Sequence, residues 1–595
     1  MRFSLGIKKN IRLTFSIVQK PWVFGWITFF VSLIIFVPFS RLGVDSHHDG
    51  IMLSSANFVA HGLSAQNEVY AQYGPISTWI QAIELQLFGP SLLVIRIASA
   101  VVLAISCGLF AVVARRLLGL HFAIVGIAVW ISCAPFFDLD LQMLPWSSDY
   151  FVLLSAICLV LATTSQVETI IWGIQFRDYF IGILLGWGIF LRLNPALPVL
   201  LLVIIGSWVY ISFKTFQRLL VGSCVGILSI LFILQLGGGI RTWWDQSIIF
   251  PRKLYVGVLK DSGLSGLRGN LIANGVPALL AMIFLFSILN FVNVRQRPKY
   301  FRTLLRHVST CITLLFLYWT FLSDGSISVL NPRLFLWGVV LGGILCLSTF
   351  MGKLESTATE SLFGYFMLVA VGLGSLTQVF PVVDRRHLWW AAIPGIFLLI
   401  SLIPKRESTK SHLVGSIILV VSLMVPAYSH AKSTLSETRV EIKTTHVLKG
   451  MLVSKDFYAA FDSSFSMIGD LERIHGPRAV INLCADGLFA TLGSRLIYPD
   501  PYFVYWSFPR AVWSEEQRQE FVAEFQPLMW LCSPITQVEE VVASYNYRLI
   551  PRPKCLDDIE RFNAWPLASF LAVPKDWQVL QSESLMLNRN VCLNL

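Results

Sequence analysis

Long apolar segments recur along most of the chain and are separated by short polar connections. About thirteen of them have the length of roughly 17–22 residues that an α-helix needs to cross a hydrocarbon core of about 30 Å. This pattern predicts a polytopic α-helical membrane protein with one helix per apolar segment. The spans are expected at 22–40, 90–113, 118–134, 149–165, 179–193, 196–213, 219–236, 271–293, 308–322, 334–351, 361–379, 388–403 and 413–428.

The pattern changes after the last of these segments. Apolar runs become shorter, and helical spacing, as in 455–476 and 514–525, alternates with buried-strand runs, as in 478–484 and 527–534. Such alternation is typical of an α/β domain. The chain is therefore expected to divide into a transmembrane bundle, residues 1–429, and a soluble α/β domain, residues 430–595.

The distribution of charge predicts how the bundle is oriented. Only 14% of the residues are charged, and the net charge is +11. The short connections on one side hold about 19 Lys and Arg residues, against about 10 in the longer loops on the other side, which is the asymmetry of the positive-inside rule. We therefore expect an integral plasma or inner membrane protein with a cytoplasmic N-terminus and an extracytoplasmic C-terminal domain. The basic charge then reflects topology, and no nucleic-acid partner is predicted.

The late cysteines support an exported C-terminal domain. Four of the ten cysteines follow the last predicted span, and they are Cys484, Cys532, Cys555 and Cys592. In an oxidising compartment they are expected to form disulfides, although four cysteines allow three pairings.

Candidate chemistry begins directly after the first span. The loop starting at Val44 sets Asp45, His47, His48 and Asp49 within a few residues at the membrane surface. A solvated loop between two spans would explain this run. The alternative is that Asp45 or Asp49 is the catalytic carboxylate of an enzyme. Asp149 opens the fourth span, where a carboxylate has either a specific partner or a helix-capping role.

Cationic residues occupy the same predicted side of the membrane. Arg192 stands in a tight turn between two spans, where a charge needs a partner or water. Arg385, Arg386 and His387 lie between two later spans and are followed by two tryptophans. Arginine can hold a phosphate through a two-pronged fork, while a solvated turn with aromatic anchors is the alternative. The loop 237–270 mixes aromatic and cationic residues, which favours an interfacial helix over a substrate lid.

Taken in order, these segments resemble the GT-C superfamily of integral-membrane glycosyltransferases. The resemblance is to the bacterial relatives of protein O-mannosyltransferases and of the lipid A aminoarabinose transferase. It is carried by HHDGIMLSSANFVAHG with YAQYGP, by WSSDYF, by GILLGWGIFLRLNP and by VVDRRHLWWAAIP.

The resemblance implies an enzyme that transfers a sugar, a hexose or a pentose, from a polyprenyl-phosphate donor. The acceptor would be an extracytoplasmic lipid, protein or polysaccharide, and the transfer would invert the anomeric centre. Asp49 is expected to be the general base, with Asp45 as the alternative. The other roles are donor-phosphate binding by Arg385, Arg386, His387 and Arg192, and sugar or acceptor binding by Asp149, Glu68 and Tyr73. Some relatives use a divalent metal ion at the first-loop carboxylates, and the metal stays unassigned.

Other functions remain open at this point. A transporter or flippase of lipid-linked sugars would favour internal repeats and broken spans near the bilayer midplane, and the sequence has neither signal. A polymerase or ligase of lipid-linked oligosaccharides would share the donor chemistry, and a non-catalytic relative would use its C-terminal domain to bind partners.

Overall fold

The helices of the structure follow the apolar pattern of the sequence. This computed structural model describes residues 20–45, 48–71, 73–137, 141–164, 174–252, 359–379, 385–401, 410–443, 447–455, 457–458, 468–469, 471–476, 480–482, 514–531, 539, 542–550 and 570–577. Every predicted span that falls on these residues is a helix. The predicted spans 271–293, 308–322 and 334–351 lie outside the described residues.

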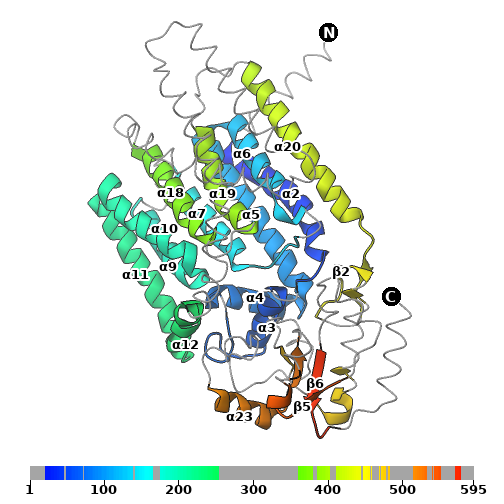
Figure 1. Ribbon diagram of the computed structural model, residues 1–595. Coiled ribbons are helices and arrows are strands. Elements are labelled where there is room, and N and C mark those ends of the chain that lie inside the picture. Colours follow the sequence, from blue (N-terminus) through cyan, green and yellow to red (C-terminus); the bar gives the residue numbers. More distant parts are fainter. Residues whose placement is uncertain are drawn as a thin grey trace.

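Ten α-helices within the described residues correspond to predicted spans, and Figure 1 shows the long helices running side by side. They are α2 (Pro21–Phe36), α5 (Leu92–Leu118), α6 (Leu120–Ser132), α7 (Ser147–Ala162), α9 (Ile174–Leu191), α10 (Leu193–Gly206), α11 (Phe213–Leu236), α18 (Thr359–Ser375), α19 (Arg385–Ser401) and α20 (Lys410–Ser436). Short 3-10 or π turns extend several of them, namely η1 (Val37–Arg41), η3 (Ser207–Ile211) and η8 (Leu376–Val379).

Three of the described helical segments are long and apolar enough to cross a membrane by themselves, and they are Pro21–Arg41, Leu92–Leu118 and Phe213–Leu236. Shorter apolar helices accompany them, at Leu120–Ser132, Ser147–Ala162, Leu193–Val209 and Leu362–Gln378. Large apolar side chains remain exposed on the outer helices, as a lipid-facing surface requires. The protein is therefore an integral membrane protein, whereas the orientation of its termini stays a prediction.

Small residues let the helices α9 and α11 approach closely. Gly182 and Gly186 on α9 face Gly222 and Gly226 on α11. A Cβ atom at Gly222 would lie 2.2 Å from the Tyr179 carbonyl oxygen, so no larger residue fits there. Two glycines four residues apart on each helix are a common arrangement at membrane helix interfaces, where backbone contact replaces the hydrophobic driving force of water.

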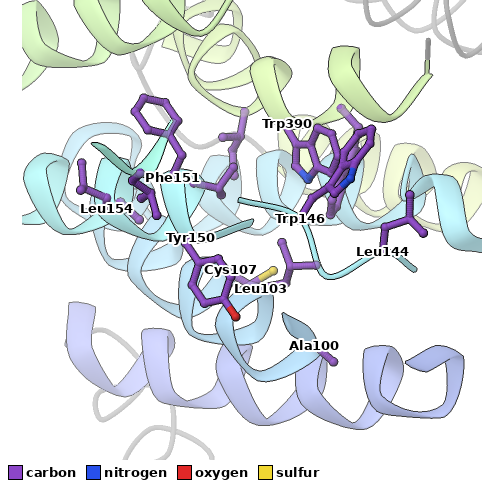
Figure 2. Packing of buried hydrophobic residues seen from close by; sticks show 14 of the residues in the cluster. Ala100, Leu103, Cys107, Leu144, Trp146, Tyr150, Phe151, Leu154 and Trp390 are labelled. Atoms are coloured by element: carbon purple, nitrogen blue, oxygen red, sulfur yellow. The ribbon is translucent and has the colours of Figure 1, made fainter. Parts of the chain in front are cut away.

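The interior of the bundle is packed around α5 and α7. Figure 2 shows side chains of α5, among them Leu103 and Cys107, together with Tyr150, Phe151 and Leu154 of α7. The Cys107 thiol is completely buried and free, so this cysteine acts as a small apolar side chain, as the sequence indicated.

Two helices form in the loop that follows the first span. They are α3 (His48–Ala60) and α4 (Pro75–Phe88), and they lie at one end of the long helices, toward the strands (Figure 1). A further short helix, α12 (Ile240–Trp244), continues as the π turn η4 (Asp245–Ile249). The amide of Gln246 bonds the backbone of Gln66 and Ala71, which fixes this segment on the turn between α3 and α4. A helix thus forms in part of the loop 237–270, and its place at the membrane interface stays a prediction.

The C-terminal part combines strands and a helix as the sequence predicted. Its four-stranded sheet has the order β3-β4-β6-β5, in which β3 and β4 are parallel and the other pairs are antiparallel. The bounds are β3 (Val480–Asn482), β4 (Leu528–Leu531), β5 (Tyr547–Leu549) and β6 (Phe570–Pro574), with α23 (Glu515–Phe525) between β3 and β4. The chain turns at Asn546, where φ is 59°, and continues as β5. The four late cysteines lie outside the described residues, so the disulfides stay a prediction.

The segment after α20 is joined to the segment before α3. α20 runs on to Ser436, past the predicted domain boundary, and is followed by the hairpin β1 (Val440–Glu441) and β2 (Leu452–Val453). Leu42 forms a parallel bridge with Leu452, and the Gly43 N–H donates to the Leu452 carbonyl at 2.8 Å. The loop that carries Asp45 is therefore held directly by C-terminal backbone.

Candidate functional site

The start of α3 is built by reciprocal capping. Oδ1 of Asp45 accepts the backbone N–H of His48 at 2.9 Å, and Oδ2 of Asp49 accepts the backbone N–H of Asp45 at 2.7 Å. These two contacts satisfy N–H groups that a helix start would otherwise leave unpaired. The His48 Nδ1 lies 3.1 Å from Oδ2 of Asp45, so the imidazole contacts this carboxylate as well. Local sequence thus determines where Asp45 and His48 stand.

Asp49 forms a buried ion pair with Arg96 of α5. Both side chains are fully buried. The Arg96 Nε donates to Oδ1 of Asp49 at 3.1 Å, its Nη2 pairs with Oδ2, and its Nη1 donates to the Leu42 carbonyl at 2.8 Å. Both carboxylate oxygens of Asp49 are therefore occupied by protein donors. Asp45 is different, because 21% of its side chain remains exposed.

Five aromatic rings gather next to Asp45, and we call them the Trp146 cluster: His48, Tyr73, Trp146, His387 and Trp390. From the centroid of Trp146, the other rings lie 4.6 Å (His48), 5.9 Å (Tyr73), 5.2 Å (His387) and 5.0 Å (Trp390) away. Figure 2 shows the Trp146 and Trp390 rings against one another. These residues come from four separate parts of the chain, so only the tertiary fold assembles the cluster.

A guanidinium and a carboxylate flank these rings. The Cζ of Arg192 lies 5.0 Å from the Tyr73 ring centroid, 5.8 Å from that of Trp146 and 5.9 Å from that of Trp390. Its Nη1 donates to the Ser147 hydroxyl at 3.3 Å. Trp390 in turn donates its indole N–H to Oδ1 of Asp149 at 2.9 Å. Asp149 therefore has a specific partner, and it orients an aromatic ring of the cluster.

Arg385 and Arg386 occupy different surroundings, although they are adjacent on α19. The Arg386 guanidinium lies within electrostatic range of Asp45. The Arg385 guanidinium lies instead near the thiol of Cys133, at the end of α6. The structure thus brings Arg386, but not Arg385, to the side of Asp45.

The electrostatics of Asp45 follow from these neighbours. Burial acts to raise the pKa of Asp45, but the hydrogen bonds and charge of His48, with a contribution from Arg386, outweigh it and hold the pKa well below its usual range. Asp45 is therefore an ionised carboxylate throughout the physiological pH range.

Helix N-termini surround this group of residues. Five helices begin at or shortly after a residue of this region: α3 at His48, α4 after Tyr73, α7 after Trp146, α10 after Arg192, and α19 with Arg386 in its first turn. The exposed N–H groups and positive dipole ends of helices favour anions. Together with Arg192 and Arg386, they place positive charge beside the carboxylate of Asp45.

Glu68 does not take part in any described contact with the Trp146 cluster. It is exposed in the turn after α3, where its Oε2 accepts the Ser64 backbone N–H at 2.7 Å. The sequence did not single out Glu84, which lies on α4 and accepts a hydrogen bond from the Tyr150 hydroxyl at 3.1 Å. Burial raises the pKa of Glu84 to about 7, against the opposing effect of the Tyr150 hydrogen bond.

The carboxylates and imidazoles near Asp45 bear on whether a metal ion binds there. No group of three or more His, Cys, Asp or Glu side chains among the described residues is arranged to hold a metal ion. Asp45 and His48 supply one carboxylate and one imidazole, while Asp49 is occupied by Arg96. The described residues therefore do not fit a metal ion. His47 lies outside the described residues.

The structure thus brings six of the predicted site residues into one region: Asp45, Tyr73, Asp149, Arg192, Arg386 and His387. Sequence reasoning missed the importance of Trp146 and Arg96. Arg96 had a signal, because a lone arginine inside an apolar span needs a partner. Trp146 had none, since a tryptophan near a membrane interface is common.

Comparison with known proteins gives matches among solved structures. No family model matches the chain, and no curated protein matches it. An oligosaccharyltransferase of Archaeoglobus fulgidus in complex with Zn and sulfate is 13% identical, with a TM-score of 0.47, over 84% of this chain and 67% of that one. ArnT from Cupriavidus metallidurans bound to undecaprenyl phosphate is 13% identical, with a TM-score of 0.40, over 92% of this chain and 97% of that one.

A third match is the archaeal oligosaccharyltransferase AglB from Archaeoglobus fulgidus in complex with an inhibitory peptide and a dolichol-phosphate. It is 10% identical, with a TM-score of 0.44, over 85% of this chain and 69% of that one.

Proposed function

We propose that this protein is a glycosyltransferase that moves a sugar from a polyprenyl-phosphate donor to a hydroxyl acceptor at the membrane surface. One observation supports the proposal most directly. An ionised carboxylate, Asp45, and two largely buried guanidiniums, those of Arg192 and Arg386, lie beside the Trp146 cluster. A sugar transfer of this kind needs both charges, because a proton leaves the acceptor while negative charge grows on the phosphate.

In this proposal Asp45 is the general base. The acceptor hydroxyl attacks the anomeric carbon, its proton passes to a carboxylate oxygen of Asp45, and the bond from that carbon to the phosphate oxygen breaks on the opposite face. Asp45 suits the role better than Asp49, because 21% of the Asp45 side chain remains exposed, whereas Asp49 is fully buried and ion-paired with Arg96. The low pKa of Asp45 keeps its carboxylate in the ionised form at neutral pH, which is the form that can take up a proton.

Arg386 and Arg192 would hold the donor phosphate. Both are almost excluded from water, so a charge-assisted contact with phosphate is screened less there than in solution. Beside Arg192, the partly exposed ring of Tyr73 offers a flat face against which a sugar ring can pack, and the buried Trp146 ring supports it from 5.9 Å. His387, whose ring lies 5.2 Å from that of Trp146, would line the same space.

The decisive experiment compares Asp45→Asn with the wild type in lipid nanodiscs. Asparagine is also a good N-cap residue, so α3 should keep its start while the carboxylate base is lost. We expect sugar transfer, or sugar release to water, from a panel of polyprenyl-phosphate hexoses and pentoses to fall about 10²- to 10⁴-fold. Binding of undecaprenyl phosphate should persist. A variant that transfers sugar at the wild-type rate would refute the role of Asp45, and a wild type that only moves the intact donor across a vesicle membrane would favour a flippase.

A further inference from the structure

The completely buried arginine of α5 has no part in the transfer chemistry proposed above. Arg96 is 0% exposed and stands in the middle of an apolar stretch of the sequence, LLVIRIASA. A charged side chain in such a place is costly unless it is fully paired. Its function therefore has to be sought in what its guanidinium holds.

The guanidinium of Arg96 holds the segment 42–49 at two points. Its Nη1 donates to the Leu42 carbonyl at 2.8 Å, ahead of Asp45 in the chain. Its Nε and Nη2 hold the Asp49 carboxylate, behind Asp45. The two contacts therefore bracket Asp45, and they anchor its segment to the long helix α5 (Leu92–Leu118).

A second link reaches Asp45 itself. Oδ2 of Asp49, which pairs with Nη2 of Arg96, also accepts the backbone N–H of Asp45 at 2.7 Å. The side chain of Asp45 is fixed separately, because its Oδ1 accepts the His48 backbone N–H and its Oδ2 contacts the His48 imidazole. Asp45 is thus held at its backbone by Asp49 and at its side chain by His48.

From this geometry we infer that Arg96 is a positioning residue, which places Asp45 through Asp49 and the Leu42 carbonyl without touching the substrate. The inference rests on the proposed function, because it concerns the placement of the proposed base. An error of about 1 Å in the placement of a reacting group can lower the rate about 10²-fold. Loss of the Arg96 contacts should therefore lower kcat and leave donor binding intact, since Arg192 and Arg386 are on other helices.

The first test is Arg96→Lys. Lysine keeps the positive charge, but its single ammonium cannot reproduce the fork that reaches Asp49 and the Leu42 carbonyl together. We expect kcat for sugar release to fall roughly 10- to 100-fold, with KM for the donor and the Kd for undecaprenyl phosphate within about 2-fold of wild type. An unchanged kcat would overturn the inference.

A pair of double variants separates positioning from stability. Arg96→Met with Asp49→Asn, and Arg96→Met with Asp49→Leu, both remove the buried charges together, which avoids leaving one charge unpaired. Asparagine can still accept the Asp45 N–H, whereas leucine cannot. We expect the asparagine version to keep a higher kcat at equal melting temperature. Equal kcat values in the two versions would contradict the link through Asp49.

A matched control comes from another buried ion pair. Asp178 on α9 pairs with Arg177 at 2.9 Å and with Arg218 at 3.5 Å. Asp178 precedes Arg192, the residue that directly follows the end of α9, by fourteen positions, or about 21 Å along the helix axis, and so is remote from the site. Asp178→Asn should lower the melting temperature without a selective loss of kcat. If Asp45→Asn is active, the proposed base fails; if Asp45→Asn is inactive while Arg96→Lys is fully active, only the positioning role fails.

Discussion

Arg386→Ala should weaken the binding of undecaprenyl phosphate by about 10- to 100-fold, whereas Arg385→Ala should leave it within about 2-fold. The two residues are adjacent and chemically identical, so each is the matched control of the other. The structure separates them, because the Arg386 guanidinium is within electrostatic range of Asp45, while that of Arg385 lies near Cys133.

The magnitude follows from the burial of Arg386, which is only 8% exposed. Two unit charges about 4 Å apart attract by about 4 kcal/mol at an effective dielectric constant near 20. Water that enters the space left by alanine returns part of this energy, so the net loss should resemble that of a charged hydrogen bond, about 1.5–3 kcal/mol. Arg386→Lys should recover only part of the affinity, because an ammonium lacks the planar fork.

The assay is a titration of undecaprenyl phosphate in detergent, followed by the shift in melting temperature, which depends on the ligand concentration relative to Kd. Detergent removes the anionic bilayer surface, so a residue that only anchors the loop to headgroups would show no effect. The reasoning would be refuted by identical titrations for wild type and Arg386→Ala, or by equal losses in the two alanine variants.

Two further predictions concern the elements around the site. Burial raises the pKa of Glu84 to about 7 from 4.5, so the folded protein binds more protons than the unfolded chain between these values. Its contribution to stability should therefore fall as the pH rises from about 4.5 to 7. Glu84→Gln should flatten this dependence in melting temperatures measured at pH 5 and pH 8, and an unchanged slope would contradict it. Gly74→Ala should destabilise the fold by at least about 1–3 kcal/mol, because Gly74 has a φ of 135° and an added Cβ would lie 2.2 Å from the Phe190 carbonyl oxygen. The control is Gly62→Ala, which also has a positive φ (97°) but meets nothing within 4 Å, so comparable melting temperatures in the two variants would count against the clash.

The sequence alone determined the helices and much of the local structure. Apolar runs must become helices in a membrane, because no water is present to satisfy backbone groups, and each predicted span within the described residues is a helix. The strands β3 and β4 and the helix α23 likewise follow from short-range patterns. The capping of α3 by Asp45 is also local, since its contacts span only a few residues.

Only the tertiary structure decided which of the chemically equivalent residues face the site. Residues adjacent on a helix point about 100° apart, so the sequence pair Arg385 and Arg386 carries no information on which one turns toward Asp45. Asp45 and Asp49 are likewise equivalent candidates for the base in the sequence. The fold distinguishes them, because Arg96, 47 residues from Asp49 along the chain, pairs with the Asp49 carboxylate. Which polar groups are paired inside a bundle depends on contacts between distant helices, because each helix satisfies its own backbone and leaves its side chains to the packing.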